Sequence, residues 1–167
     1  MSGTRGEEAT SPVVSFTGIT LAVLLTDQFT KFLALTLLAS VETVPLVAGI
    51  FHFTLVRNTG IAFGLLRGHE SLLLGLITLS LCVLLWIGIR MHLPATPGAF
   101  KKTPALAHWG LALILGGAAG NWIDRLRFHA VIDFLDFRIW PVFNVADSAI
   151  TIGVCLYLIL LMKKPSS

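Results

Sequence analysis

The sequence predicts an all-α polytopic membrane protein with four transmembrane helices and a small extracytoplasmic β-element. The chain of 167 residues is 55% hydrophobic and only 13% charged. Its mean hydropathy of +0.85 lies well above the range of soluble domains. Four long apolar stretches each approach the roughly 20 residues that a membrane helix needs, and they lie at 13–38, 72–91, 105–123 and 142–162. We therefore expect one membrane-embedded domain spanning residues 1–167.

The first predicted span, 13–38, contains two charged residues, Asp27 and Lys31. No short apolar core with a small-residue cleavage site precedes it, so we expect this span to be retained. The two charges are four residues apart and share one face of a helix. We expect Lys31 to pair with Asp27 or to extend toward the membrane surface, in preference to a direct catalytic role.

A small sheet is predicted outside the membrane. The run Phe51-His-Phe-Thr-Leu-Val-Arg57 alternates as a half-buried strand does, and Asn58-Thr59-Gly60 predicts a turn after it. Residues 41–46 are a candidate partner strand, and 131–137 a candidate third strand. The segments expected outside the membrane on this side are 39–71 and 124–141.

The third predicted span, 105–123, carries a face of small residues. Gly116 and Gly120 are four residues apart, and Ala112 and Ala119 extend the same face. Small residues let membrane helices approach one another closely. We expect this helix to pack closely against its neighbours.

Four spans bring most of the acidic residues to one side of the membrane. Only Glu7 and Glu8 of the nine acidic residues fall on the other side. We expect Asp27 in the near half of its span, Asp124 at the end of the third helix, and Asp147 about 7–8 Å inside the fourth. Carboxylates near hydrocarbon cost several kcal/mol unless they are paired or hydrated. A membrane-embedded acid/base site is the first hypothesis.

Two neighbouring carboxylates can share a proton, so that one acts as general base on water and the other as general acid toward a carbonyl. Asp147 lies on a polar stripe with Asn144 and is one candidate. Asp133 and Asp124 compete for the second position, although Arg125 beside Asp124 favours an ion-paired, structural carboxylate. In an extended 131–137 segment only one of Asp133 and Asp136 can face the site, and we expect Asp136 to be solvated.

Other chemistries have less support in the sequence. The five histidines are scattered and form no H-E-x-x-H motif, so we expect no metal and no cofactor. A Ser148/Lys31 dyad would need a deprotonated lysine among acids, which carboxylates disfavour. The basic residues form no stripe with aromatics, so nucleic acid is not an expected partner. Two alternatives remain, a small proton-coupled transporter that uses the acids as a relay and a structural or assembly protein.

The orientation prediction rests on lysine and arginine near the predicted spans. With a cytoplasmic N-terminus, that side holds Arg5, Arg90, Lys101, Lys102, Lys163 and Lys164, and the other side holds Arg57, Arg67, Arg125, Arg127 and Arg138. The opposing arginines are interleaved with aspartates, whereas the lysine pairs flank spans directly. We therefore expect both termini to be cytoplasmic.

Five short motifs occur in order along residues 20–155. They are Asp27-Gln-Phe-Thr-Lys31, Arg57-Asn58-Thr-Gly60-Ile-Ala62-Phe63, Gly116-Gly-Ala-Ala-Gly-Asn121-Trp-Ile-Asp124-Arg125, Val131-Ile-Asp133-Phe and Phe143-Asn144-Val-Ala146-Asp147-Ser148. Together they resemble the motifs of the lipoprotein signal peptidases (signal peptidase II). Thr30 and Ile61 depart from the family's more usual residues.

The resemblance implies an aspartic endopeptidase of the bacterial inner membrane, with its site toward the outer face. Its substrates would be prolipoproteins, cut just before a cysteine that carries diacylglycerol, in contact with membrane lipid. The implied catalytic pair is Asp133 and Asp147. The implied binding and support residues are Asp27, Lys31, Asn58, Gly60, Asn121, Asp124, Arg125 and Asn144. We expect a monomer.

Overall fold

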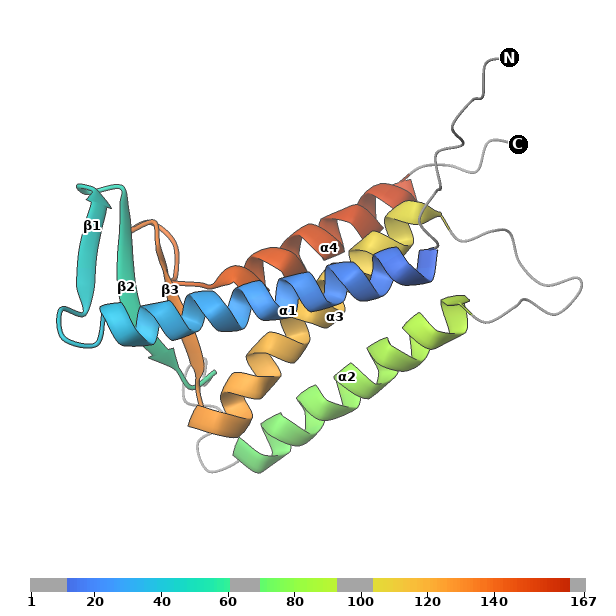
Figure 1. Ribbon diagram of the computed structural model, residues 1–167, viewed down its shortest axis with the longest axis horizontal. Coiled ribbons are helices and arrows are strands. Elements are labelled where there is room, and N and C mark those ends of the chain that lie inside the picture. The colour runs from blue at the N-terminus through green and yellow to red at the C-terminus, as the bar shows by residue number, and fades with distance from the viewer. Residues whose placement is uncertain (1–11, 61–69, 93–103, 163–167) are drawn as a thin grey trace, which may run out of the picture.

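Four helices and one three-stranded sheet make up the described part of the chain (Figure 1). The computed structural model describes residues 12–60, 70–92 and 104–162. In chain order the elements are α1 (Pro12–Leu37), β1 (Thr43–Val47), β2 (Phe51–Asn58), α2 (Glu70–His92), α3 (Ala105–Phe128), β3 (Val131–Asp136) and α4 (Val145–Met162). The four predicted helices and the predicted β-element are confirmed.

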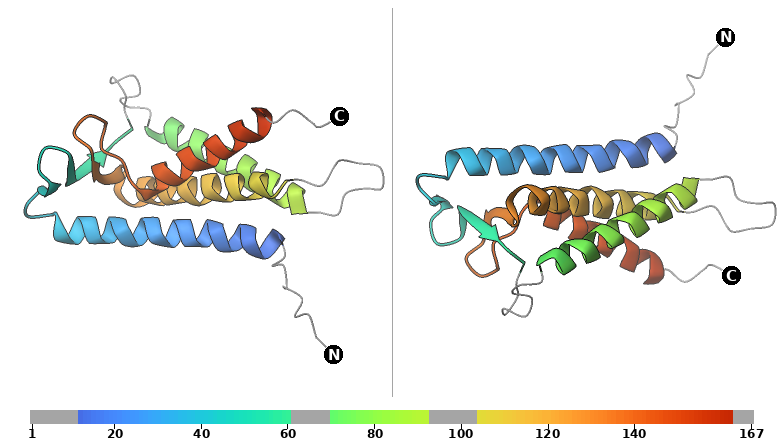
Figure 2. Two further views of the ribbon diagram at one scale, coloured as in Figure 1. Left: turned by 90° about the horizontal axis from the view of Figure 1, so that it is seen from above. Right: turned by 90° about the horizontal axis from the view of Figure 1, so that it is seen from below.

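Helix α3 is the centre of the bundle, and α1, α2 and α4 pack against it (Figure 2). The other three helices are long and apolar enough to cross a membrane, over Val14–Leu37, Ser71–Met91 and Val145–Met162. Helix α3 is less apolar and contains many of the buried residues. Its polar residues His108, Asn121 and Asp124 are therefore shielded by protein rather than exposed to lipid.

The glycines of α3 allow this close packing. A Cβ on Gly116 would lie 2.7 Å from the carbonyl oxygen of Thr20 in α1, and a Cβ on Gly117 would collide with the carbonyl oxygen of Ala146 in α4. Ala112 on the same helix is fully buried. The predicted small-residue face is confirmed toward α1, where Gly116 and Gly120 make close contacts, and Gly117, which was not part of the prediction, packs against α4.

Two helix ends differ from the predicted span limits. Helix α3 continues past Asp124 to Phe128 and ends where His129 adopts the left-handed conformation (φ 56°), with its N–H bonded to the carbonyl of Arg125. Arg125 in the last turn favours this extension, because positive charge stabilises a helix C-terminus. Helix α4 starts at Val145 rather than near residue 142. Asp147 therefore lies in its first turn and not 7–8 Å inside it.

The sheet has the order β1-β2-β3, and both neighbouring pairs are antiparallel. Val56 of β2 is paired with Asp133 of β3, and Asn58 with Val131. The predicted turn after β2 is present, since the N–H of Gly60 donates to Asn58 Oδ1 at 2.9 Å and Gly60 has a φ of 73°. The strands run across the ends of the helices, at the end opposite the start of α1 and the end of α4 (Figure 1).

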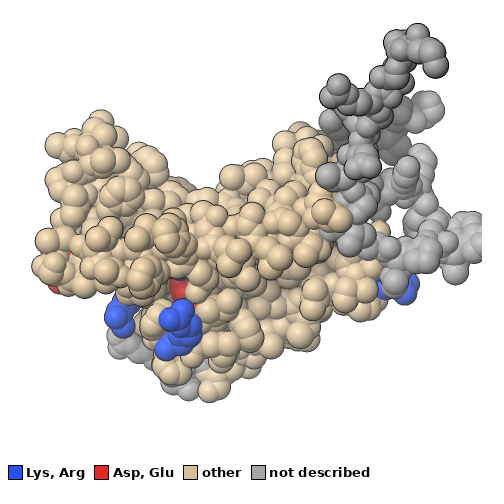
Figure 3. Space-filling view, viewed as in Figure 1, with Lys and Arg blue, Asp and Glu red and all other residues tan. Residues whose placement is uncertain are grey.

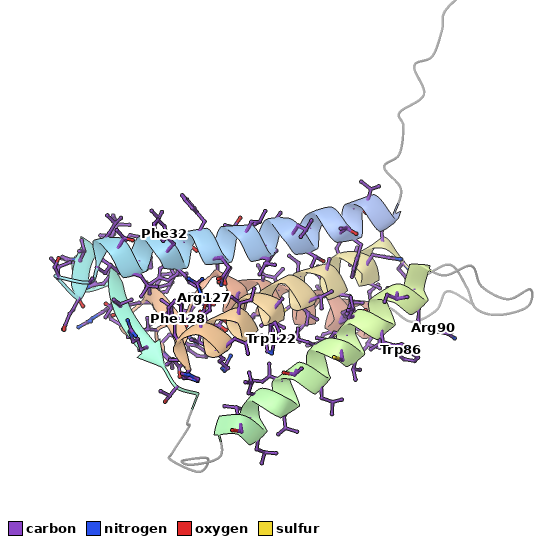
Figure 4. The ribbon with its side chains drawn as sticks, turned by 60° about the horizontal axis from the view of Figure 1, so that its bottom comes forward. Phe32, Trp86, Arg90, Trp122, Arg127 and Phe128 are labelled. Atoms are coloured by element: carbon purple, nitrogen blue, oxygen red, sulfur yellow. The ribbon has the colours of Figure 1, made fainter. Side chains whose placement is uncertain are left out.

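Charged side chains gather near the two ends of the bundle, and the visible face between them carries almost none (Figure 3). Arg90 lies 5.8 Å from the centre of the Trp86 ring, and Arg127 lies 4.9 Å from the ring of Phe128. These pairs lie at opposite ends of the helices (Figure 4). Tryptophan is enriched at membrane interfaces, and the exposed side chains between the two ends are mainly apolar, as expected for an apolar belt that faces lipid.

Candidate active site

Asp133 and Asp147 come from different elements that meet at the sheet end of the bundle. Asp133 lies in β3 and is only 1% exposed. Asp147 lies in the first turn of α4. Because β3 is extended, Asp133 and Asp136 point to opposite faces of the strand, and Asp133 is the one that faces the helices.

Three asparagine amides hold the two carboxylates. Asn58 donates its Nδ2 to Asp133 Oδ2 at 2.9 Å, and Asn144 donates its Nδ2 to Asp133 Oδ1 at 2.7 Å. Asn121 donates its Nδ2 to Asp147 Oδ1 at 2.8 Å. Within the described residues the ion pairs involve Asp27, Asp124 and Asp136, and none reaches these two carboxylates. Asp133 and Asp147 are therefore oriented by neutral donors, which leaves them able to exchange protons.

Asn144 also caps α4. Its Oδ1 accepts the N–H of Asp147 at 2.8 Å, while its own N–H donates to Asp147 Oδ2 at 3.3 Å. This reciprocal arrangement is a capping box, which satisfies backbone donors that a helix start leaves unpaired. Asp147 thus stabilises the helix start and also lies beside Asp133, so a structural and a chemical role are compatible.

A buried ion triad lies behind the two carboxylates. Lys31 Nζ lies 2.8 Å from Asp27 Oδ2 and 2.8 Å from Asp124 Oδ2, and all three side chains are almost fully buried. The expected pairing of Lys31 with Asp27 is confirmed. Asp124 is ion-paired, as expected, but its partner is Lys31 of α1 and not the neighbouring Arg125, because α3 continues through Asp124 and turns its side chain toward α1.

The two acids of the triad bind backbone next to the candidate pair. Asp27 Oδ1 accepts the N–H of Ala146 at 2.9 Å, and Asp124 Oδ2 accepts the N–H of Ile132 at 3.0 Å. Ala146 precedes Asp147, and Ile132 precedes Asp133. Each carboxylate of the triad therefore fixes the main chain beside one carboxylate of the pair, and Lys31 links the two supports.

Lys31 further determines how Asn121 is oriented. Its Nζ donates to Asn121 Oδ1 at 2.9 Å. An ammonium group can only donate, so the amide oxygen must face Lys31 and the amide NH₂ must face Asp147. Asn144 Nδ2 donates to the same Oδ1 at 3.1 Å and reinforces this orientation.

Arg125 and Gly60 lie next to each other at the edge of the site. A Cβ on Gly60 would be 3.4 Å from Arg125 Nη2, so glycine leaves room for the guanidinium. Arg125 Nη1 donates to the carbonyl of Asn121 at 3.2 Å. Its Nε is buried and finds no acceptor among the described residues. All ten sequence-predicted site residues therefore lie in one connected region.

Two carboxyl groups of β3 have altered acidity for different reasons. Burial is the largest effect on the pKa of Asp133, and together with the nearby charge of Asp147 it raises this pKa to about 6. The hydrogen bonds from Asn58 and Asn144 act in the opposite direction and lower it. The pKa of Asp136 is lowered, first by the hydroxyl of Thr54 and then by the backbone N–H of Arg138. Asp136 is 5% exposed and paired with Arg138, so the expectation that it is solvated is wrong.

An apolar cavity of about 250 Å³ lies behind β3, between α1 and the sheet. Phe134 forms part of its wall and points away from the site, because it follows Asp133 in an extended strand.

Gln28 belongs to the site but was not singled out from the sequence. Its Nε2 donates to Asp124 Oδ1 at 3.1 Å and to the carbonyl of Gly120 at 3.2 Å. A polar residue next to Asp27 inside an apolar span was the available signal. No group of three or more histidine, cysteine or acidic residues among those described is arranged to hold a metal ion.

The protein is a four-helix membrane bundle in which asparagine amides bind two carboxylates at one end. These features define its class as a multi-pass membrane protein with a buried acidic site. Residues 19–163 match the family described as signal peptidase (SPase) II. The chain belongs to this family of lipoprotein signal peptidases, and it is an aspartic-type endopeptidase that removes signal peptides from prolipoproteins.

Individual relatives agree with this assignment. The lipoprotein signal peptidase of Moorella thermoacetica is 43% identical over 138 residues, which are 83% of this chain and 86% of that protein. The lipoprotein signal peptidase of Nostoc sp. is 47% identical over 148 residues, covering 84% and 85% of the two chains. A bacterial membrane enzyme solved by the in meso method has a TM-score of 0.71 and 28% identity over 90% of this chain and 94% of that one. The chain is a multi-pass membrane protein of bacteria.

Proposed function

We propose that Asp133 and Asp147 are the catalytic pair of this peptidase. The observation that carries the proposal is their shared neighbour, Asn144, which donates to Asp133 at 2.7 Å and forms the capping pair with Asp147. Asp124 is a poorer candidate for the second position, because its oxygens are occupied by Lys31, Gln28 and the main chain.

We assign the shared proton of the reactive form to Asp133, because burial and the nearby charge of Asp147 raise its pKa to about 6 and so increase the fraction of Asp133 that is protonated near neutral pH. Asp147 takes a proton from water as the water oxygen attacks the scissile carbonyl carbon, and Asp133 gives its proton to the carbonyl oxygen. In the second step the C–N bond breaks. Asp147 returns its proton to the leaving amine, and Asp133 recovers one from the diol.

The substrate cysteine is proposed to carry diacylglycerol, with cleavage just before it. Helix α4 has 18 residues and is about 27 Å long at 1.5 Å per residue, close to the roughly 30 Å of membrane hydrocarbon. Asp147 in its first turn therefore lies near the boundary between hydrocarbon and headgroups. A scissile bond anchored by acyl chains would be held at this depth, which restricts its search to the membrane plane.

The site is proposed to face the outer side of the inner membrane, with both termini cytoplasmic. Arg90, at the end opposite the sheet, is the one residue of the cytoplasmic basic set within the described part of the chain. The other members of that set, and Arg67, lie outside the described residues. A cysteine at Thr43 should react with an impermeant reagent added outside, and one at Ala99, also outside the described residues, should not.

A monomer is the proposed active form, because the ten candidate site residues of a single chain already lie in one connected region. A transporter relay is not favoured, because the acidic side chains that the structure describes lie at the sheet end rather than along a path to both surfaces.

The proposed substrate is tested with purified protein in detergent and a diacylglyceryl-modified prolipoprotein, followed by mass spectrometry. We expect a product that begins at the lipidated cysteine. The same precursor without lipid should be cleaved far more slowly. Equal rates for the two precursors would contradict the proposed recognition of lipid, while leaving the peptidase assignment intact.

A further inference from the structure

Large apolar side chains are exposed on two neighbouring loops at the sheet end of the protein. Ile139 is 95% exposed and Trp140 69%. Together with exposed residues of the β1–β2 hairpin and of the same β3–α4 loop they form what we term the outer apolar patch, which consists of Leu46, Val47, Ile50, Phe137, Ile139 and Trp140. Single exposed apolar residues are common on proteins, but a contiguous group of this size marks an interaction surface.

The two loops are packed together by aromatic rings. The ring centroids of Phe51, in β2, and Phe137 are 4.8 Å apart, and those of Phe137 and Phe143 are 5.9 Å apart. The patch is therefore one surface that joins the hairpin to the connection between β3 and α4.

The conformation of the β3–α4 loop is fixed by its own hydrogen bonds. Arg138 has a φ of 64°, and its N–H donates to Asp136 Oδ1 at 2.8 Å, while its guanidinium binds Asp136 Oδ2 at 3.1 Å. The N–H of Ile139 donates to the carbonyl of Phe137 at 2.7 Å. These hydrogen bonds keep the side chains of Ile139 and Trp140 pointing outward, so their exposure is determined by the conformation of the loop.

The position of the patch identifies what covers it. The strands run across the helix ends, and the hairpin tip and the β3–α4 loop project to the same side of the bundle (Figures 1 and 2). Trp140 is five residues before Val145, where α4 enters the apolar belt. A loop at this level that extends sideways from a transmembrane bundle meets the lipid surface. Tryptophan is enriched at that depth, where its ring is partly apolar and its N–H is hydrated.

We propose that the outer apolar patch inserts into the headgroup region of the bilayer leaflet on the sheet side. The β3–α4 loop links the strand that carries Asp133 to the helix that carries Asp147. Insertion of Ile139 and Trp140 would therefore hold this link at a constant depth relative to the lipid. The insertion itself depends only on the membrane position of α4 and not on the proposed catalytic roles.

Fluorescence of Trp140 tests the insertion directly. The full chain contains four tryptophans, and the other three are changed to phenylalanine in the test protein, namely Trp86, Trp109 and Trp122. It is reconstituted in vesicles of phosphatidylethanolamine and phosphatidylglycerol with bromine near the headgroup end of the acyl chains. We expect Trp140 to lose most of its emission and to resist aqueous acrylamide. Full quenching by acrylamide with no effect of bromine would overturn the proposal.

A second measurement avoids the tryptophan changes. A spin label at Ile139→Cys is compared with labels at Glu42→Cys, an exposed position between α1 and β1, and at Leu158→Cys, which is exposed along α4. The natural cysteines are replaced by serine in all three proteins, at Cys82 and Cys155. We expect the Ile139 label to be more accessible to oxygen than the Glu42 label and less than the Leu158 label. If the Ile139 label is no more accessible to oxygen than the Glu42 label, lipid insertion is refuted. The patch would then be a binding surface for a protein partner or a second copy of the chain.

Discussion

Asn144 donates its side-chain Nδ2 to Asp133 Oδ1 at 2.7 Å, and its own Oδ1 accepts the N–H of Asp147 at 2.8 Å. One amide therefore sets the position of a strand carboxylate and the start of a helix. The arrangement explains how two acids that are 14 residues apart meet without a cation between them. It also predicts that their chemical and structural contributions can be separated by substitution.

The first prediction concerns the pair itself. Asp133→Asn and Asp147→Asn should each lower cleavage by about 10²–10⁴-fold or more, because asparagine keeps the volume but cannot transfer the proton. Both proteins should remain folded in detergent. Asp124→Asn should instead lower thermal stability, since it weakens the pairing with Lys31. The assignment is wrong if Asp133→Asn turns over normally while folded Asp124→Asn is inactive.

The acidity of Asp133 gives a second prediction. Its pKa is raised to about 6, so its carboxyl C=O infrared band should disappear as the pH rises through that value. Asn58→Ala removes a hydrogen bond that lowers the pKa and should move the midpoint up. Asp147→Asn removes a charge that raises the pKa and should move it down. Shifts in the same direction for the two variants would contradict the described environment.

The buried triad gives a third prediction. Lys31→Met leaves two buried carboxylates without their cation and should destabilise the protein by about 3–5 kcal/mol. Arg138→Met provides the control, because the Arg138 side chain is 49% exposed and Asp136 keeps its hydrogen bonds to Thr54 and to the backbone N–H of residue 138. We therefore expect a smaller loss, closer to the about 0–1 kcal/mol of solvent-exposed pairs.

Thermal unfolding in detergent compares these two variants. Adding Asp27→Asn and Asp124→Asn to Lys31→Met should restore part of the stability, since the uncompensated charges are then removed. If the triple variant is less stable than Lys31→Met alone, the triad does not act through charge.

A fourth prediction addresses helix packing. Gly120→Ala would place a Cβ against Asp27 Oδ2 and should cost about 1–3 kcal/mol through overpacking. Gly75→Ala in α2 is the matched control, since no atom lies within 4 Å of the added Cβ. The two variants are compared by thermal unfolding and by cleavage rate. Equal stability would mean that α1 and α3 are not in the close contact described.

The sequence by itself determined the membrane class, the family and the residues that converge. Hydropathy and length are local properties, so the spans were predictable from composition along the chain. Side chains alternate between the two faces of an extended strand, so the three-residue spacing of Asp133 and Asp136 predicted from sequence that they point to opposite faces of β3. The order of the polar motifs identified all ten candidate site residues, although Gln28 was passed over.

Only the tertiary structure decided which charges pair and where the helices end. Asp124 binds Lys31, which is 93 positions earlier in the chain, instead of its neighbour Arg125. Helix α3 passes through Asn121 and Asp124 because partners from α1 and β3 satisfy their side chains. Asp136 is buried because Thr54 faces it from β2. Each of these outcomes depends on distances between remote segments, which local sequence patterns do not contain.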